Sequence, residues 1–130
     1  MPEYQPRVPV PREYGSFVRG YLECAEWCGL DDEQREALEL SVSPTWSRDA
    51  LAGAYRECTE FQDDHAAELA NADPARAGHD FWLTRNHHGA GYWDGDYPNA
   101  IGKRLTDGAH VYGEQCVWFD ADTETLSLEG

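Results

Sequence analysis

The chain has 130 residues, enough for one domain with a substantial hydrophobic core and too few for two such domains. It carries 25 acidic and 10 basic residues, and the net charge of −15 argues against direct binding to nucleic acid phosphates or anionic membranes. No apolar run approaches the roughly 18 residues that cross a bilayer, and the first residues lack the order of a signal peptide. We therefore expect a cytoplasmic protein that has no membrane partner. No cofactor is expected either.

The acidic residues are spread along the chain. Residues 1–72 hold 15 acids and 6 bases, and residues 73–130 hold 10 acids and 4 bases, so there is no separate acidic tail. Three interpretations of this charge stay open: solubility, adaptation to high salt, and mimicry of a nucleic acid backbone that fills the basic groove of another protein.

The first half of the chain predicts an extended arm followed by helices. Four prolines within residues 1–12 deny a regular helix there, and we expect this arm to precede a single domain over residues 13–130. Apolar residues then recur at helical spacing over 16–28 and, in a long stretch, over 47–72. A shorter helix is expected over residues 31–40, and Asp73-Pro74 is expected to end the long helix.

The second half predicts strands around one more helix. Residues 81–85 and 91–93 have the aromatic and β-branched content of a hairpin. A helix is expected between Pro98 and Gly113, followed by a second hairpin with strands at 115–119 and 125–128. The predicted fold class is α+β, with three N-terminal helices packed on a four-stranded, mainly antiparallel sheet of two hairpins joined by a helix.

The first predicted hairpin carries the residues that suggest a ligand or metal site. Trp82, Arg85 and Trp93 could bind an anionic ligand, since guanidinium groups suit carboxylates and phosphates, although a structural salt bridge of Arg85 is the favoured alternative. Groups of the type that bind divalent metals also gather there. They are His79, Asp80, His87, His88 and Asp94. Adjacent histidines at a turn point apart, so surface histidines are favoured over a shared metal.

An acidic ridge is predicted on the long helix. Glu57, Glu60, Asp64 and Glu68 follow one another at spacings of three and four residues and therefore share a face. The ridge is interpreted either as a solvated helix face, which is favoured, or as a partner-binding surface.

The four cysteines are expected to be reduced thiols in the core, because no secretory signal precedes them. Cys24, Cys28 and Cys58 with His65 could hold zinc, but their spacing is not that of a zinc finger. The chain also lacks a Gly-x-Ser-x-Gly elbow, a phosphate-binding loop and a dinucleotide fingerprint. No catalytic residues are therefore assigned, and a binding protein is favoured over an enzyme.

The residues from Ala77 to Asn86, AGHDFWLTRN, continue to GAGYWD at 89–94. This motif resembles a family of small acidic proteins of unknown function from tailed bacteriophages, with looser similarity over about two thirds of the chain. The family has glycine where His87 stands here, so we expect a less strict need for positive φ at this turn. The resemblance implies phage origin and an accessory role inside the infected host cell.

The expected function combines that origin with the charge. The protein is expected to bind a host or defence protein with a basic surface. Inhibition of that protein, and mimicry of a nucleic acid by the acidic residues, stay open as extensions of this expectation. Two alternatives stay open: a metal-dependent hydrolase or nuclease at the histidine hairpin, and a binder of small anionic ligands.

Overall fold

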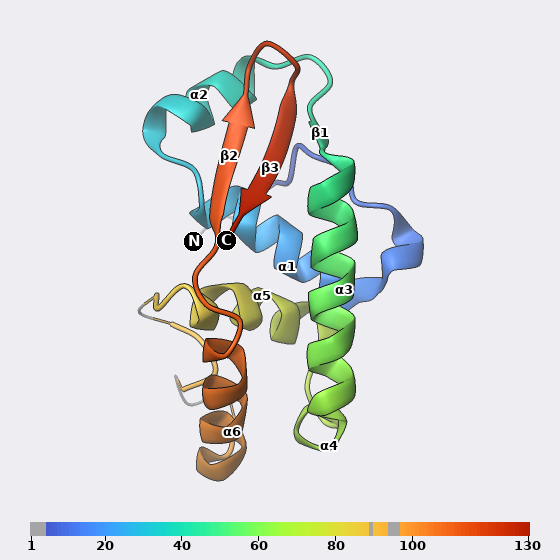
Figure 1. Ribbon diagram of the computed structural model, residues 1–130, viewed down its shortest axis with the longest axis vertical. Helices are drawn as coiled ribbons and strands as arrows, with labels where there is room; N and C mark the ends of the chain where they lie inside the picture. Colours follow the sequence, from blue (N-terminus) through green and yellow to red (C-terminus); the bar gives the residue numbers. More distant parts are fainter. Residues whose placement is uncertain (1–4, 89, 94–96) are drawn as a thin grey trace.

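The computed structural model describes residues 5–88, 90–93 and 97–130. In chain order the elements are η1 (Arg12–Tyr14), α1 (Gly15–Cys28), α2 (Asp32–Leu40), β1 (Thr45–Trp46), α3 (Arg48–Asp64), α4 (Ala66–Leu69), α5 (Pro74–Arg85), α6 (Asn99–His110), β2 (Cys116–Asp120) and β3 (Thr125–Glu129). The sheet and α2 lie at one end of the long axis, α4 and α6 lie at the other, and α1 and α5 cross the middle (Figure 1). In the part of the chain that is described, no helix is long and apolar enough to span a membrane.

The α+β class is confirmed, but the predicted four-stranded, mainly antiparallel sheet is wrong. The described residues form a three-stranded mixed sheet in the order β1-β3-β2. β2 and β3 form the predicted C-terminal hairpin, with Val117 opposite Leu128 in an antiparallel register. The third strand, β1, lies between the helices predicted over 31–40 and 47–72, where no strand was predicted, and it pairs in parallel with β3 at Thr45 and Thr125. Two residues beside Pro44 are too short a run to show a strand pattern.

The other predicted hairpin does not exist, because residues 81–85 form the last part of α5. From Ala77 to Arg85 every residue of this helix except His79 is buried. A helix that is covered all round loses the 3.6-residue apolar period that identifies an amphipathic helix. Its aromatic residues then resemble a strand, because strand propensity largely reflects how well a side chain packs when buried.

The signals at Asp73 and Pro74 mark the start of α5. The Asp73 carboxylate accepts a hydrogen bond from the backbone N–H of Arg76 at 3.0 Å, and Pro74 occupies the first helical turn. Both are features of a helix N-terminus. The long helix predicted before them is also divided, since α3 ends at Asp64 and α4 begins at Ala66. The residue between them, His65, leaves helical geometry with φ −120° and ψ 29°.

The expected second strand of that hairpin instead packs a tyrosine against α5. The backbone N–H of Tyr92 donates to the Thr84 hydroxyl at 3.1 Å, and the Tyr92 hydroxyl donates to the Ala77 carbonyl at 2.6 Å. The Tyr92 ring stacks on Phe61 of α3 at 5.9 Å. This loop therefore closes the core between α3 and α5.

Helices α1 and α5 cross at glycines. A Cβ atom at Gly20 would fall on the carbonyl oxygen of Ala75, and one at Gly78 would fall on the carbonyl oxygen of Phe17. Only glycine allows two helix backbones to approach this closely. The crossing fixes the side chains of both helices, and these line the groove described below.

The N-terminal arm docks onto α1. Val8 is buried, and the buried carboxylate of Glu26 accepts hydrogen bonds from the backbone N–H groups of Arg7 and Val8 at 2.9 and 3.1 Å. The Arg7 guanidinium donates to the Ser41 carbonyl at 2.7 Å. One acidic side chain of α1 therefore holds an otherwise irregular segment in place. Residues 1–4 of the predicted arm lie outside the described residues.

Candidate functional site

The residues predicted to bind an anionic ligand do not form one open site. Trp82 is 1% exposed and packs edge-on against Tyr21 at 5.5 Å. Arg85 is also buried, whereas Trp93 is 44% exposed. Trp82 and Arg85 therefore belong to the core, whereas Trp93 lies at the surface.

Arg85 forms hydrogen bonds inside the core. Its guanidinium donates to the Glu57 carboxylate at 2.8 Å and to the Tyr21 hydroxyl at 2.9 Å. It also donates to the carbonyls of Tyr112 and Gly113, which follow α6. These four hydrogen bonds join Arg85 to three other parts of the fold. The guanidinium therefore has a structural role, as the predicted structural salt bridge implies.

Those of the predicted metal ligands that lie within the described residues do not converge. No group of three or more histidine, cysteine or acidic side chains suited to a metal ion occurs within residues 5–88, 90–93 and 97–130. His79 lies on α5, whereas His87 and His88 follow its end, and Asp94 lies outside the described residues. The exposed His87 ring packs on His110 at 4.4 Å.

The backbone at His87 contradicts one further expectation. Its φ is 56°, in the left-handed region that favours glycine. The turn after α5 therefore does require positive φ, and histidine adopts it.

Most of the predicted acidic ridge takes part in internal contacts. Glu57 binds Arg85, Glu60 accepts a hydrogen bond from the Tyr112 hydroxyl at 2.9 Å, and Glu68 lies 3.2 Å from His65. Asp64 is exposed. Glu57 pairs with the Arg85 guanidinium, and Glu68 lies 3.7 Å from the guanidinium of Arg104. The ridge therefore offers fewer carboxylates to a partner than its sequence spacing suggests.

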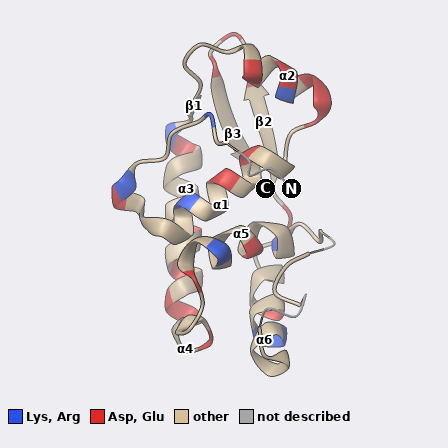
Figure 2. Cartoon of the chain, turned by 180° about the vertical axis from the view of Figure 1, so that it is seen from behind, with Lys and Arg blue, Asp and Glu red and all other residues tan. Residues whose placement is uncertain are grey.

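A second acidic surface lies on α2 and its N-cap, and we call it the α2 acidic face. Figure 2 shows acidic residues concentrated on α2 at the end of the molecule that holds the sheet. All of its carboxylate residues are exposed. They are Asp31, Asp32, Glu33, Glu36 and Glu39. The one basic residue of this segment, Arg35, turns toward α1 and donates to the carbonyls of Glu26 and Trp27. The face is therefore purely negative.

Exposed apolar side chains border the α2 acidic face. Leu40 is 79% exposed and Val42 is 92% exposed. The segment that carries them is fixed by Glu124 in the turn between β2 and β3, which accepts hydrogen bonds from the Val42 N–H at 2.8 Å and the Ser41 hydroxyl at 2.9 Å. These bonds lower the pKa of Glu124. The apolar border is thus held in a defined position beside the carboxylates.

The α2 acidic face could have been predicted from the amino-acid sequence. Five of the nine residues from Asp31 to Glu39 are acidic, which is the densest such run in the chain. The acids at the start of this run predict a helix N-terminus, and the same run as a whole forms an exposed surface.

A groove of about 580 Å³ lies between α1 and α5 beside their glycine crossing. Its walls carry Glu23 and Trp27 from α1 and Arg76, His79 and Asp80 from α5. The rings of Trp27 and His79 lie 6.1 Å apart. Two of these residues, His79 and Asp80, were predicted from the sequence as candidate metal ligands at the start of a strand, whereas they lie on a helix.

The charges of this groove are set by burial and by neighbouring groups. Asp80 is buried and accepts a hydrogen bond from the Tyr97 hydroxyl at 2.9 Å, while the Arg76 guanidinium lies 3.8 Å away. Burial lowers the pKa of His79, and the positive charge of Arg76 lowers it further. Burial raises the pKa of Glu23. A neutral imidazole beside a tryptophan and an arginine can bind a flat anionic molecule.

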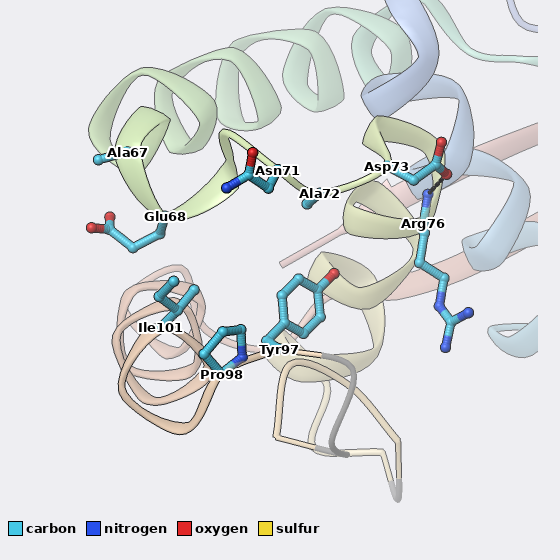
Figure 3. Close-up of a pocket in the computed structure, with 9 residues that line it drawn as sticks. All are labelled: Ala67, Glu68, Asn71, Ala72, Asp73, Arg76, Tyr97, Pro98 and Ile101. Atoms are coloured by element: carbon cyan, nitrogen blue, oxygen red, sulfur yellow. Dashed lines mark hydrogen bonds between the residues drawn. The ribbon is translucent and has the colours of Figure 1, made fainter.

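A smaller pocket of about 340 Å³ adjoins this groove and shares Asp73 and Arg76 with it. Figure 3 shows Ile101 of α6 and Glu68 of α4 at one end of the pocket and Arg76 at the other, with its guanidinium directed away from Ile101. Tyr97 stands between them. Arg76 therefore marks the boundary between two hollows on the same side of α5.

Comparison with protein-family models, with curated proteins and with solved structures finds no match.

Proposed function

We propose that the protein is a small acidic accessory protein that binds a partner protein through the α2 acidic face. The observation that carries the proposal is the geometry of that face. Five exposed carboxylates share one short segment, its single guanidinium is turned inward onto α1, and exposed Leu40 and Val42 border it.

The chemistry of this face defines the partner. Carboxylates three and four residues apart on a helix repel one another by a few tenths of a kcal/mol each, and a basic partner surface removes that repulsion. The overall charge of −15 attracts such a partner over long distances and raises the association rate. The apolar border contributes contact area, because the burial of apolar surface favours association.

The partner class follows from the same charges and from the resemblance to phage proteins. A protein whose groove normally holds nucleic acid presents clustered lysine and arginine to phosphates, and the α2 acidic face could occupy that groove. Nucleic acid itself carries the same sign of charge as this protein and is not proposed as a ligand. A host or defence protein that handles nucleic acid is therefore the proposed target.

Charge reversal on α2 tests the proposal. Tagged wild-type protein, Glu33→Lys/Glu36→Lys and a matched control, Asp63→Lys/Glu114→Lys, are used to capture proteins from a bacterial host lysate. All four positions are exposed, and both double variants change the net charge by the same amount. A stoichiometric partner should be captured by the wild type and the control, be lost with the α2 variant, and be released by salt. Equal capture by both variants would contradict the proposal.

The groove between α1 and α5 favours a second candidate, the binding of a small anionic ligand. Arg76 supplies a guanidinium, and Trp27 and His79 supply rings on either wall. Nucleoside monophosphates are suitable probes because they combine a flat base with a phosphate. Stabilisation of the wild type against heat by such a probe, and its loss in Arg76→Gln, would favour this function. No shift in melting temperature at millimolar concentrations would exclude these ligands.

A further inference from the structure

Two cysteines lie side by side on α1. Cys24 and Cys28 are one helical turn apart, and their sulfur atoms are separated by 4.0 Å. Cys24 is buried, whereas Cys28 is partly exposed and is the last residue of the helix. The Cys28 sulfur is therefore accessible to a reagent in solvent, whereas the Cys24 sulfur is buried next to it.

The surroundings make the two thiols different. The hydrogen bond from Cys24 lowers the pKa of Cys28 to about 7, against the opposing effect of burial and with help from the Arg35 guanidinium. Arg35 is held near the end of α1 by its bonds to the carbonyls of Glu26 and Trp27. Burial raises the pKa of Cys24, and the neighbouring Cys28 sulfur raises it further. At neutral pH Cys28 is thus a substantial fraction thiolate, and Cys24 is a thiol.

We propose that Cys28 is a peroxide-reactive thiol and that Cys24 is its resolving thiol, so that a hydroperoxide converts the pair into a disulfide within α1. The proposal is independent of partner binding, because its readout is the chemical state of two sulfur atoms.

The reaction takes place in two steps. The Cys28 thiolate attacks one oxygen of hydrogen peroxide, the O–O bond breaks, and the departing hydroxide takes up a proton to give water and a sulfenic acid on Cys28. The Cys24 sulfur then attacks the Cys28 sulfur, the S–O bond breaks, and the hydroxyl leaves with the Cys24 proton as a second water. Two thiols lose two electrons in total, and one peroxide gains them.

The second step requires the end of α1 to open. Cβ atoms one turn apart on a helix are about 5–6 Å apart, whereas a disulfide needs about 3.5–4.5 Å. Cys28 ends the helix, and the bond from the Gly29 N–H to the Ala25 carbonyl at 2.9 Å closes its last turn. Breaking this bond lets Cys28 approach Cys24. It also displaces the carbonyls that hold Arg35, so oxidation is expected to loosen the contact between α1 and α2.

The other two cysteines provide internal comparisons. Cys58 is fully buried, and burial raises its pKa well above the usual value. Cys116 is exposed and is the first residue of β2. If exposure alone governed the reaction, Cys116 would react before Cys28.

Peroxide titration with peptide mass analysis tests the proposal. Wild-type protein and Cys116→Ser are treated with equimolar hydrogen peroxide, alkylated and digested with trypsin, which leaves both cysteines in the peptide 20–35. We expect this peptide to lose the mass of two hydrogens in both proteins, faster than Cys116 of the wild type is oxidised. The rate should rise as the pH increases from 6 to 8, as the thiolate fraction of Cys28 does.

Two further variants separate the roles. In Cys24→Ser the Cys28 sulfenic acid should accumulate and be trapped by a dimedone-type reagent. Cys28→Ser should lose rapid peroxide consumption altogether. The proposal is overturned if Cys116 of the wild type reacts first, if Cys28→Ser consumes peroxide at the wild-type rate, or if Cys28 is oxidised without ever joining Cys24.

Discussion

Glu57 and Glu60 lie on the same face of α3, yet their side chains contact different kinds of group. Glu57 accepts a hydrogen bond from the buried Arg85 guanidinium, and Glu60 accepts one from the Tyr112 hydroxyl near the surface. Removal of the first partner leaves a buried charge without its counter-ion, which is far more costly than loss of a hydrogen bond in solvent.

We predict that Glu57→Ala lowers the free energy of unfolding by about 3 kcal/mol. The matched variant Glu60→Ala should lower it by about 1 kcal/mol or less, because Glu60 is exposed. Urea denaturation of both variants measures the difference. If both variants lose only a similar, small free energy of unfolding, Glu57 is not needed to neutralise the buried charge of Arg85.

A second prediction at the residue scale concerns the positive φ of His87. The left-handed conformation costs a residue with a Cβ atom about 1–2 kcal/mol relative to glycine. His87→Gly and His87→Ala both remove the ring that packs on His110. The difference between their free energies of unfolding therefore measures the cost of the left-handed backbone conformation. We expect His87→Gly to be more stable than His87→Ala by about 1 kcal/mol in urea denaturation. The opposite order would contradict the left-handed geometry at this turn.

At the scale of elements, the α1–α5 crossing organises the fold. A methyl group at Gly78 has no room beside the Phe17 carbonyl, whereas a methyl group at Gly53 of α3 meets no atom within 4 Å. Both glycines lie in helices, so the intrinsic helix propensity favours alanine equally at both positions. Only the packing differs.

We therefore predict opposite effects of the same substitution. Gly53→Ala should stabilise the protein by about 0.5–1 kcal/mol, since alanine favours the helix. Gly78→Ala should destabilise it by about 2 kcal/mol or more, because the helices have to separate. Thermal unfolding of the two variants gives the signs directly. Stabilisation by both would mean that α1 and α5 are not in close contact.

The C-terminal hairpin was predicted well because side chains along β2 alternate between exposed and buried positions. The helix over 16–28 was predicted because its apolar residues recur at helical spacing, although most of its residues are buried. α5 was missed because its buried residues include Asp80, Thr84 and Arg85, so that apolar residues do not recur at helical spacing along it. β1 was missed because a strand of two residues has no pattern, and its partner β3 lies about 80 residues away in the chain.

The candidate surfaces were predictable to different degrees. The groove brings Trp27 to His79 only because glycines at the crossing bring α1 and α5 together, which no local pattern shows. The inward turn of Arg35, which makes α2 purely negative, likewise depends on where α1 ends. The acidic composition of residues 31–39 was visible directly.

At the scale of the whole molecule, repulsion between acidic residues opposes folding. The net charge is −15, and the surface ion pairs of the described residues, such as Lys103 with Asp107, are exposed and weak. Salt screens repulsion and attraction alike, but repulsion is the larger of the two here. We predict that the melting temperature rises when sodium chloride is increased from about 0.02 to 0.5 M, across which the screening length falls severalfold. A fall over this range would show that attractive pairs dominate.

The same charge is proposed to guide the protein to its partner. Amide hydrogen exchange, measured on the captured complex and on the free protein, locates the contact directly. The proposed function predicts slower exchange in the complex over residues 31–42, which carry the α2 acidic face and its apolar border, with little change over 57–68. Protection confined to residues 57–68 or to the walls of the α1–α5 groove would contradict the proposal that α2 is the partner-binding surface.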